Sequence, residues 1–138
     1  MISLILGHKG SGKTKRLISC VNEAIEQSKG NVICVEEKTT LTYDVDHRAR
    51  LISASDYRVS GFNAFYGFLA GICAGDHDIT DVLVDATLKI GGRDYVALAS
   101  FLEDVYNLSE EQDKHFVFTV SADKEELPDS IFNFCKVI

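Results

Sequence analysis

The sequence predicts a three-layer α/β/α sandwich whose central sheet is mostly parallel and has about five strands. Three observations lead to this class. Short, nearly unbroken apolar runs, which suit strands buried on both faces, alternate along the chain with segments of helical period. Such alternation implies right-handed crossovers between parallel strands. Hydrophobic residues form 46% of the 138-residue chain and no linker or repeat interrupts it, so we expect one domain over residues 1–138.

The first half of the chain begins with an apolar strand over Met1–Leu6. A helix is predicted over Lys13–Ser28, because apolar residues recur there on one face and Gly30 supplies a stop. That face is formed by Leu17, Ile18, Val21, Ala24 and Ile25. The β-branched run Asn31–Val35 predicts the second strand.

Residues 38–60 follow no single period, although Leu41, Tyr43 and Val45 alternate with polar residues. Arg50–Ser53 fits one more short strand. Ser60 is a suitable N-cap for a helix that Gly75 closes. Its inward face consists of Phe62, Phe65, Tyr66, Leu69, Ile72 and Cys73.

The second half continues the alternation. Strands are expected at Ile79–Val84 and His115–Val120, with a Gly91–Gly92 loop and a helix over roughly Asp94–Asn107 between them. The inward face of that helix is formed by Tyr95, Leu98, Ala99, Leu102, Val105 and Tyr106. Pro128 is expected to open a short helix before a terminal strand at Lys136–Ile138.

Composition narrows the class of protein. The net charge of −7 disfavours attraction to nucleic acid or to an anionic membrane surface. The longest apolar stretch, 62–74, is broken by Asn63, Gly67 and Gly71 and falls short of the roughly 20 residues of a membrane span. No signal peptide is evident, so we expect a cytoplasmic protein. The four cysteines occur in apolar segments without a CxxC pair, which favours reduced, buried thiols.

The first strand leads into a phosphate-binding pattern. GxxxxGK[ST], the P-loop or Walker A motif, is matched in full by Gly7, His8, Lys9, Gly10, Ser11, Gly12, Lys13 and Thr14. Glycines let consecutive N–H groups face phosphates, and the following helix adds its free amides and dipole. Lys13 is expected to reach the β- and γ-phosphates and Thr14 to ligate Mg²⁺. A glycine-rich turn without a ligand is the alternative.

The strand Ile79–Val84 runs into Asp85, as in a Walker B segment whose aspartate holds Mg²⁺. Asp85 also fits an ordinary strand-end carboxylate. Because a bound magnesium ion needs a carboxylate nearby, we expect Thr14 and Asp85 to share the metal. Many P-loop ATPases place a glutamate after this aspartate, whereas the next residue here is Ala86. The chain therefore either hydrolyses slowly or takes its base from another position.

The motif order resembles that of RecA-like P-loop ATPases, in which the glutamate stands at the end of the strand after the P-loop helix. Glu36 and Glu37 occupy that place here, and Asp85 is followed by a small residue, as in that family. The resemblance implies a catalytic role for Glu36 or Glu37, although both also fit a polar strand exit. Thr119 and Ser121, at the end of the fourth strand, are possible sensors of the γ-phosphate.

Across almost its whole length the chain resembles small bacterial ATP-binding proteins that are sometimes labelled twitching-motility ATPases. The GSGKT segment carries that likeness, but the second domain and the histidine and aspartate boxes of the retraction ATPase are missing. A thymidine-kinase-like protein would need a glutamate after Asp85 and usually a cysteine zinc site. An NKxD guanine motif is also missing, so adenine is the default base and ATP with Mg²⁺ the expected ligand.

Three functions stay open at this point. The first is a slow or partner-stimulated ATPase with a regulatory or assembly role, acting with an unknown protein partner or by self-association. The second is a small-molecule kinase of the nucleoside type, with Arg48, Arg50 and Arg58 in a lid over residues 43–58. The third is a non-catalytic interaction module that keeps the nucleotide for stability.

Overall fold

A computed structural model describes residues 2–38, 40–41 and 44–138, so Met1, Thr39, Thr42 and Tyr43 lie outside the described residues. In the described chain six strands form one sheet in the order β3-β2-β4-β5-β1-β6, and every neighbouring pair is parallel. The strands are β1 Ile2–Leu6, β2 Asn31–Glu36, β3 Arg50–Ser53, β4 Ile79–Val84, β5 His115–Val120 and β6 Cys135–Val137. The predicted α/β class with a mostly parallel sheet is confirmed, with six strands where about five were expected.

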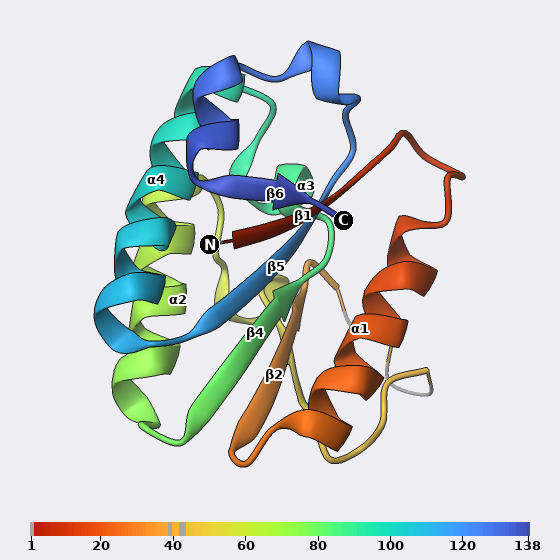
Figure 1. Cartoon of the computed structure of the whole chain (residues 1–138), viewed down its shortest axis with the longest axis vertical. Helices are drawn as coiled ribbons and strands as arrows, with labels where there is room; N and C mark the ends of the chain where they lie inside the picture. The colour runs from red at the N-terminus through yellow and green to blue at the C-terminus, as the bar shows by residue number, and fades with distance from the viewer. Residues whose placement is uncertain (1, 39, 42–43) are drawn as a thin grey trace.

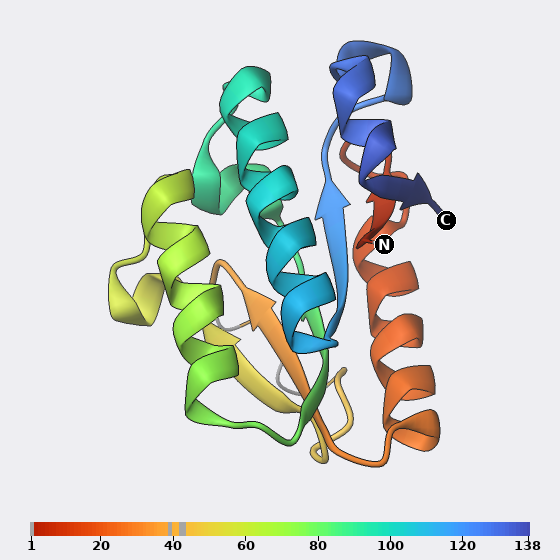
Figure 2. The same ribbon diagram turned by 60° about the vertical axis from the view of Figure 1, so that its left-hand side comes forward.

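Helices cover both faces of this sheet (Figures 1 and 2). They are α1 Lys13–Gln27, α2 Phe62–Gly75, α3 Thr87–Gly91 and α4 Tyr95–Gln112. α1 lies on one face, and α2 and α4 pack side by side on the other. No helix in the described part of the chain combines the length and apolarity needed to cross a membrane.

The α1 face has a small core of its own. Leu17 and Val21 are buried against Ile5, Cys34 and Leu83 of the sheet. Three apolar residues of the segment between β2 and β3, which are Leu41, Val45 and Ala49, complete this core beside α1. This face of the sheet is therefore covered by α1 together with apolar residues of the segment between β2 and β3.

The opposite face is built around aromatic rings. Phe65 of α2 stacks on Phe101 of α4 at 5.0 Å between ring centroids, and Phe101 meets the edge of Phe118 of β5 at 5.7 Å. The helical period over 94–107 had not placed Phe101 inward, yet it is 3% exposed and joins both helices to the sheet. Burial of three such rings supplies a large apolar area to this core.

Several element boundaries differ from the sequence-based expectation. α2 has Gly61 rather than Ser60 at its N-cap, and Gly61 adopts a positive φ of 88°. α4 begins after Asp94, which is its N-cap, and continues beyond Asn107 to Gln112, because Leu108 packs against the core and Ser109 is buried. The expected loop before Gly92 contains the short helix α3. Pro128 precedes a 3₁₀ turn, Asp129–Asn133.

The cysteines are free thiols, and Cys34, Cys73 and Cys135 are buried, as their apolar surroundings predicted. Burial raises the pKa of Cys34 and of Cys135 to about 12. Both therefore stay protonated at neutral pH and behave as apolar core residues.

The strand order determines which chain ends meet. β5 lies between β1 and β4, so the carboxyl ends of all three are neighbours, an arrangement compatible with RecA-like and Rossmann-like folds. Val84 pairs with Phe118 and Leu6 with Val120, which brings Asp85 beside Thr119 and Gly7 beside Ser121. Residues that follow these strands are therefore the first place to look for a site.

Candidate functional site

A cleft of about 620 Å³ opens at the carboxyl ends of β1, β4 and β5. Its walls come from residues 8–10 and 12–15, from Asp85 and Ala86 after β4, from Thr119 and Ser121 on β5 and just beyond it, and from Lys89 and Arg93. The structure thus brings most of the predicted phosphate-loop residues together with the predicted metal and sensor residues. Ligands of open parallel sheets bind at this edge.

The backbone between β1 and α1 needs glycine at two points. At Gly7, where φ is 145°, a Cβ would collide with the side chain of Ser11. Gly12 is the N-cap of α1 with φ 86°, in the left-handed region that costs other residues energy. Glycine at 7 lets the loop fold back on itself, and glycine at 12 turns the chain into the helix.

The same segment presents uncommitted backbone donors. The N–H groups of Gly10 and Gly12, and those of Lys13, Thr14 and Lys15 in the first turn of α1, donate to no other described group. No side chain caps this helix end, and no acidic residue occupies its first turn. A helix start with free amides and no carboxylate attracts an anion through hydrogen bonds and the helix dipole.

Lys13 rests on the loop itself. Its Nζ donates to the carbonyl oxygen of His8 at 3.2 Å. Partial burial lowers the pKa of the Lys13 ammonium; the charge of Lys89 adds to the lowering and Asp85 opposes it. The ammonium is thus held in the cleft without a full counterion, a position in which an incoming anion would be favoured.

Thr14, Asp85 and Thr119 form one hydrogen-bonded group at the base of the cleft. The Thr14 hydroxyl lies 3.1 and 3.3 Å from the two Asp85 oxygens, and the Thr119 hydroxyl donates to Asp85 Oδ1 at 2.7 Å. Thr119 also accepts the N–H of Ala86 at 2.9 Å. The residues predicted to share a metal are therefore in direct contact, and Thr119 positions the carboxylate.

The donor atoms of this group suit a magnesium ion. A hydroxyl and a half-buried carboxylate are hard oxygen ligands, and magnesium usually takes one or two such groups and completes its shell with water and phosphate oxygens. Nitrogen or sulfur ligands, which would favour zinc or copper, are absent from the described cleft lining apart from the exposed His8.

Glu36 lies near this group but is engaged elsewhere. Val35 pairs with Val84, so Glu36, the last residue of β2, lies beside Asp85. Its carboxylate is 2% exposed and accepts hydrogen bonds from the N–H and hydroxyl of Thr40, at 2.5 and 2.9 Å, and from the N–H of Leu41 at 3.3 Å. Glu36 therefore holds the start of the segment after β2 and does not line the cleft.

Glu37, the other predicted catalytic residue, comes after the end of β2 and does not line the cleft either. Its carbonyl oxygen accepts the N–H of Ser55 at 3.0 Å and the hydroxyl of Ser53 at 3.3 Å. The Glu37 carbonyl thus holds the end of β3, whereas the Glu36 carboxylate holds residues 40–41. Of the possible sensors, Thr119 serves Asp85, and Ser121 lines the cleft without a hydrogen bond from its side chain to another described group.

His8 connects the loop between β1 and α1 to the segment after β5. Its Nε2 lies 2.6 Å from Glu126 Oε1 and 3.3 Å from Asp123 Oδ2. The Gly7 N–H donates to the carbonyl oxygen of Ala122 at 3.1 Å. All three ionisable side chains are exposed, and their contacts give His8 a role in fixing the loop.

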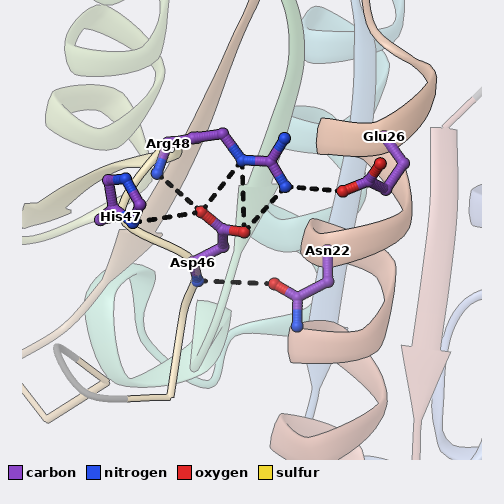
Figure 3. Close-up of polar contacts among 5 residues, drawn as sticks. All are labelled: Asn22, Glu26, Asp46, His47 and Arg48. Carbon is purple, nitrogen blue, oxygen red and sulfur yellow. Dashed lines mark hydrogen bonds and ion pairs between the residues drawn. The ribbon is translucent and has the colours of Figure 1, made fainter.

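The arginines predicted to form a lid do not converge on the cleft. Arg48 Nη2 donates to Glu26 of α1 at 2.6 Å and to Asp46 at 3.0 Å, and the Asp46 N–H donates to Asn22 (Figure 3). At a rise of 1.5 Å per residue, Glu26 lies roughly 20 Å along α1 from Lys13. Arg48 therefore fixes the segment before β3 to the far half of α1, with His47 beside Asp46.

Lys89 and Arg93 are cleft residues that the sequence did not single out. The available signal was their short distance after Asp85 in the sequence, but the segment looked like a loop.

Comparison with known proteins does not identify the site: no family model matches the chain, and no curated protein matches it significantly.

Proposed function

We propose that this chain binds a nucleoside triphosphate, ATP with Mg²⁺, in a RecA-like P-loop site formed by residues 7–14. One observation carries the proposal: five uncommitted backbone N–H groups open into a cleft whose described lining holds five lysine or arginine side chains and one carboxylate. The whole chain has a net charge of −7, so this positive cleft is a local exception. Such focusing of charge selects an anionic ligand.

Magnesium fits the same cleft. Thr14 and Asp85 would hold the ion, which supplies charge neutralisation between phosphate oxygens. Lys13 would leave the His8 carbonyl oxygen and pair with the β- and γ-phosphates. A chain with a free amide cradle, a cation and an oxygen-ligand pair has each part that triphosphate binding requires.

For activity we propose slow or partner-stimulated hydrolysis of ATP, in a regulatory or assembly role. In that reaction water adds to the γ-phosphorus, the bond to the β-phosphate oxygen breaks, and ADP and phosphate leave. Slow turnover is supported by Ala86 at the position after Asp85 and by the Glu36 carboxylate, which is occupied by residues 40–41. The same two observations favour a second candidate, a nucleotide-binding module without turnover.

Calorimetry with MgATP on the wild-type chain and on Lys13→Ala tests binding. Lys29→Ala is a matched control, because it removes one exposed lysine at the other end of α1. We expect saturable heat for the wild type and the control, and at least a tenfold weaker affinity for Lys13→Ala, since a charge-assisted contact is worth about 1.5 kcal/mol or more. Equal affinity of all three proteins, or no heat from any, would reject the proposal.

A phosphate-release assay on the same proteins separates the two activities. Turnover in the wild type and in Lys29→Ala, but not in Lys13→Ala, supports the ATPase. Saturable binding with no release above the Lys13→Ala background supports the module without turnover.

A further inference from the structure

We propose that Lys89 and Arg93 form a second wall of the phosphate site, supplied by the same chain, that binds the terminal phosphate of a triphosphate. This inference rests on the proposed function and deepens it. Both residues line the cleft with Lys13 and Asp85, and they approach it from α3 and from the junction of α3 with α4.

The backbone after β4 places this wall. Ala86 has φ 58° and ψ 46°, an unusual left-handed conformation for a residue with a side chain, and its N–H is held by Thr119. This turn lets α3 start at Thr87, directly after Asp85 and Ala86. Lys89 therefore stands one helical turn from the predicted metal carboxylate, and its position is fixed by helix and strand rather than by a loose loop.

The end of α3 is fixed as well. Gly91 packs so closely on the ring of Phe62 that a Cβ would collide with it, and the N–H of Gly61 donates to Ile90 at 2.9 Å. Arg93 follows at once and precedes Asp94, whose carboxylate caps α4 through the N–H groups of Val96 and Ala97. Arg93 is thus anchored on both sides by packed helices.

No hydrogen bond or ion pair joins Lys89 or Arg93 to another group in the described part of the chain. The charge of Lys89 lowers the pKa of Lys13, and the charge of Arg93 contributes to the lowered pKa of Glu126, which contacts His8. Lys89 and Arg93 are exposed side chains of the cleft lining, Lys89 on the Lys13 side and Arg93 within electrostatic reach of Glu126. Lys13 and Lys89 are like charges in one cleft, so an anion that binds between them would be favoured.

The terminal phosphate is the group that such a wall would reach. In the proposed site the free amides of Gly10 and of residues 12–15 would hold the inner phosphates, and the outermost phosphate would lie on the Asp85 side, where Thr14 and Asp85 would hold magnesium. Lys89 rises from the segment directly after Asp85. An ADP molecule would leave this side of the cleft unfilled, so Lys89 and Arg93 would favour the triphosphate over the diphosphate.

Calorimetry with MgATP and MgADP, on Lys89→Ala, Arg93→Ala, their double variant and Lys29→Ala, tests the inference. Each single substitution is expected to weaken ATP about tenfold and ADP less than twofold, and the double variant should bind both nucleotides alike. Equal weakening of ATP and ADP, or no weakening of ATP, would overturn the inference. If the wild type binds ATP but the variants show either of these outcomes, the inference fails and the proposed function stands. If the wild type binds neither nucleotide, the proposed function itself has failed.

Mixing variants tests that the wall comes from the same chain. The mixture contains equal amounts of Lys13→Ala and of the double variant. If the cations act within their own chain, each site in it lacks either Lys13 or the pair Lys89 and Arg93. We expect such a mixture to bind ATP no more tightly than its better component. Recovery of wild-type affinity in a fraction of sites would show that Lys89 and Arg93 act on a neighbouring copy, which would overturn the inference.

Discussion

Replacing Thr119 by valine removes one hydroxyl and keeps the shape of the side chain. Thr119 is 1% exposed. Its hydroxyl donates a hydrogen bond to Asp85 Oδ1 at 2.7 Å and accepts one from the Ala86 N–H at 2.9 Å. Loss of the contact to a carboxylate costs about 1.5–3 kcal/mol and an unpaired N–H about 1–3 kcal/mol. Water from the adjacent cleft can satisfy part of either group, so we expect Thr119→Val to lower the free energy of unfolding by about 2–4 kcal/mol.

Urea denaturation followed by circular dichroism measures this difference, and an unchanged m-value shows that the unfolded state is the same. Thr119→Ser is the control, because it keeps the hydroxyl and gives up one buried methyl group, at about 1 kcal/mol. Two results would refute the reasoning. One is a Thr119→Val protein within about 0.5 kcal/mol of the wild type, a change typical of unimportant surface positions. The other is a serine variant that loses as much stability as the valine variant.

Two further substitutions test contacts outside the proposed phosphate site. The Thr87 hydroxyl is fully buried and has no hydrogen-bond partner in the described chain. Thr87→Val should therefore raise the free energy of unfolding by about 1 kcal/mol in the same urea assay. A loss of stability would instead show that the hydroxyl has a partner. The hydrogen bonds from Arg48 lower the pKa of Asp46 to about 2, so Asp46 stabilises the fold above its unfolded pKa near 4, and this stabilisation disappears as the pH falls toward 2. Asp46→Asn should therefore be less stable than the wild type at pH 7 and equal to it near pH 2. Thermal melts across this range check it, and a difference that does not change with pH would contradict it.

Strand bounds were predicted more closely than helix bounds, since α4 ends at Gln112 and not near Asn107. β4 and β5 are apolar on both faces and have the expected bounds, whereas α3 was taken as part of a loop because five residues are too few to show a helical period. Phe101 lies one position from a residue chosen by period, and only the packing of α2 against α4 shows that its ring is central.

Part of the candidate site could also be predicted from local sequence, and part depends on the tertiary structure. The spacing of residues 7–14 predicted one wall of the cleft, and the proximity of Thr14 and Asp85 was expected because both were assigned to one metal site. The second wall depends on the left-handed turn at Ala86, which no local rule for alanine predicts. Likewise the engagement of Glu36 depends on how residues 40–41 fold back onto β2, a tertiary contact that strand periodicity does not contain.

The contacts of His8 and Gly7 with residues 122–126 join two stretches that are more than a hundred residues apart in sequence. A ligand that changed the conformation of the first stretch would break or move these contacts with the second, whose acidic side chains are exposed. A fluorophore attached near Asp123 would then report occupancy of the cleft from outside the proposed phosphate site.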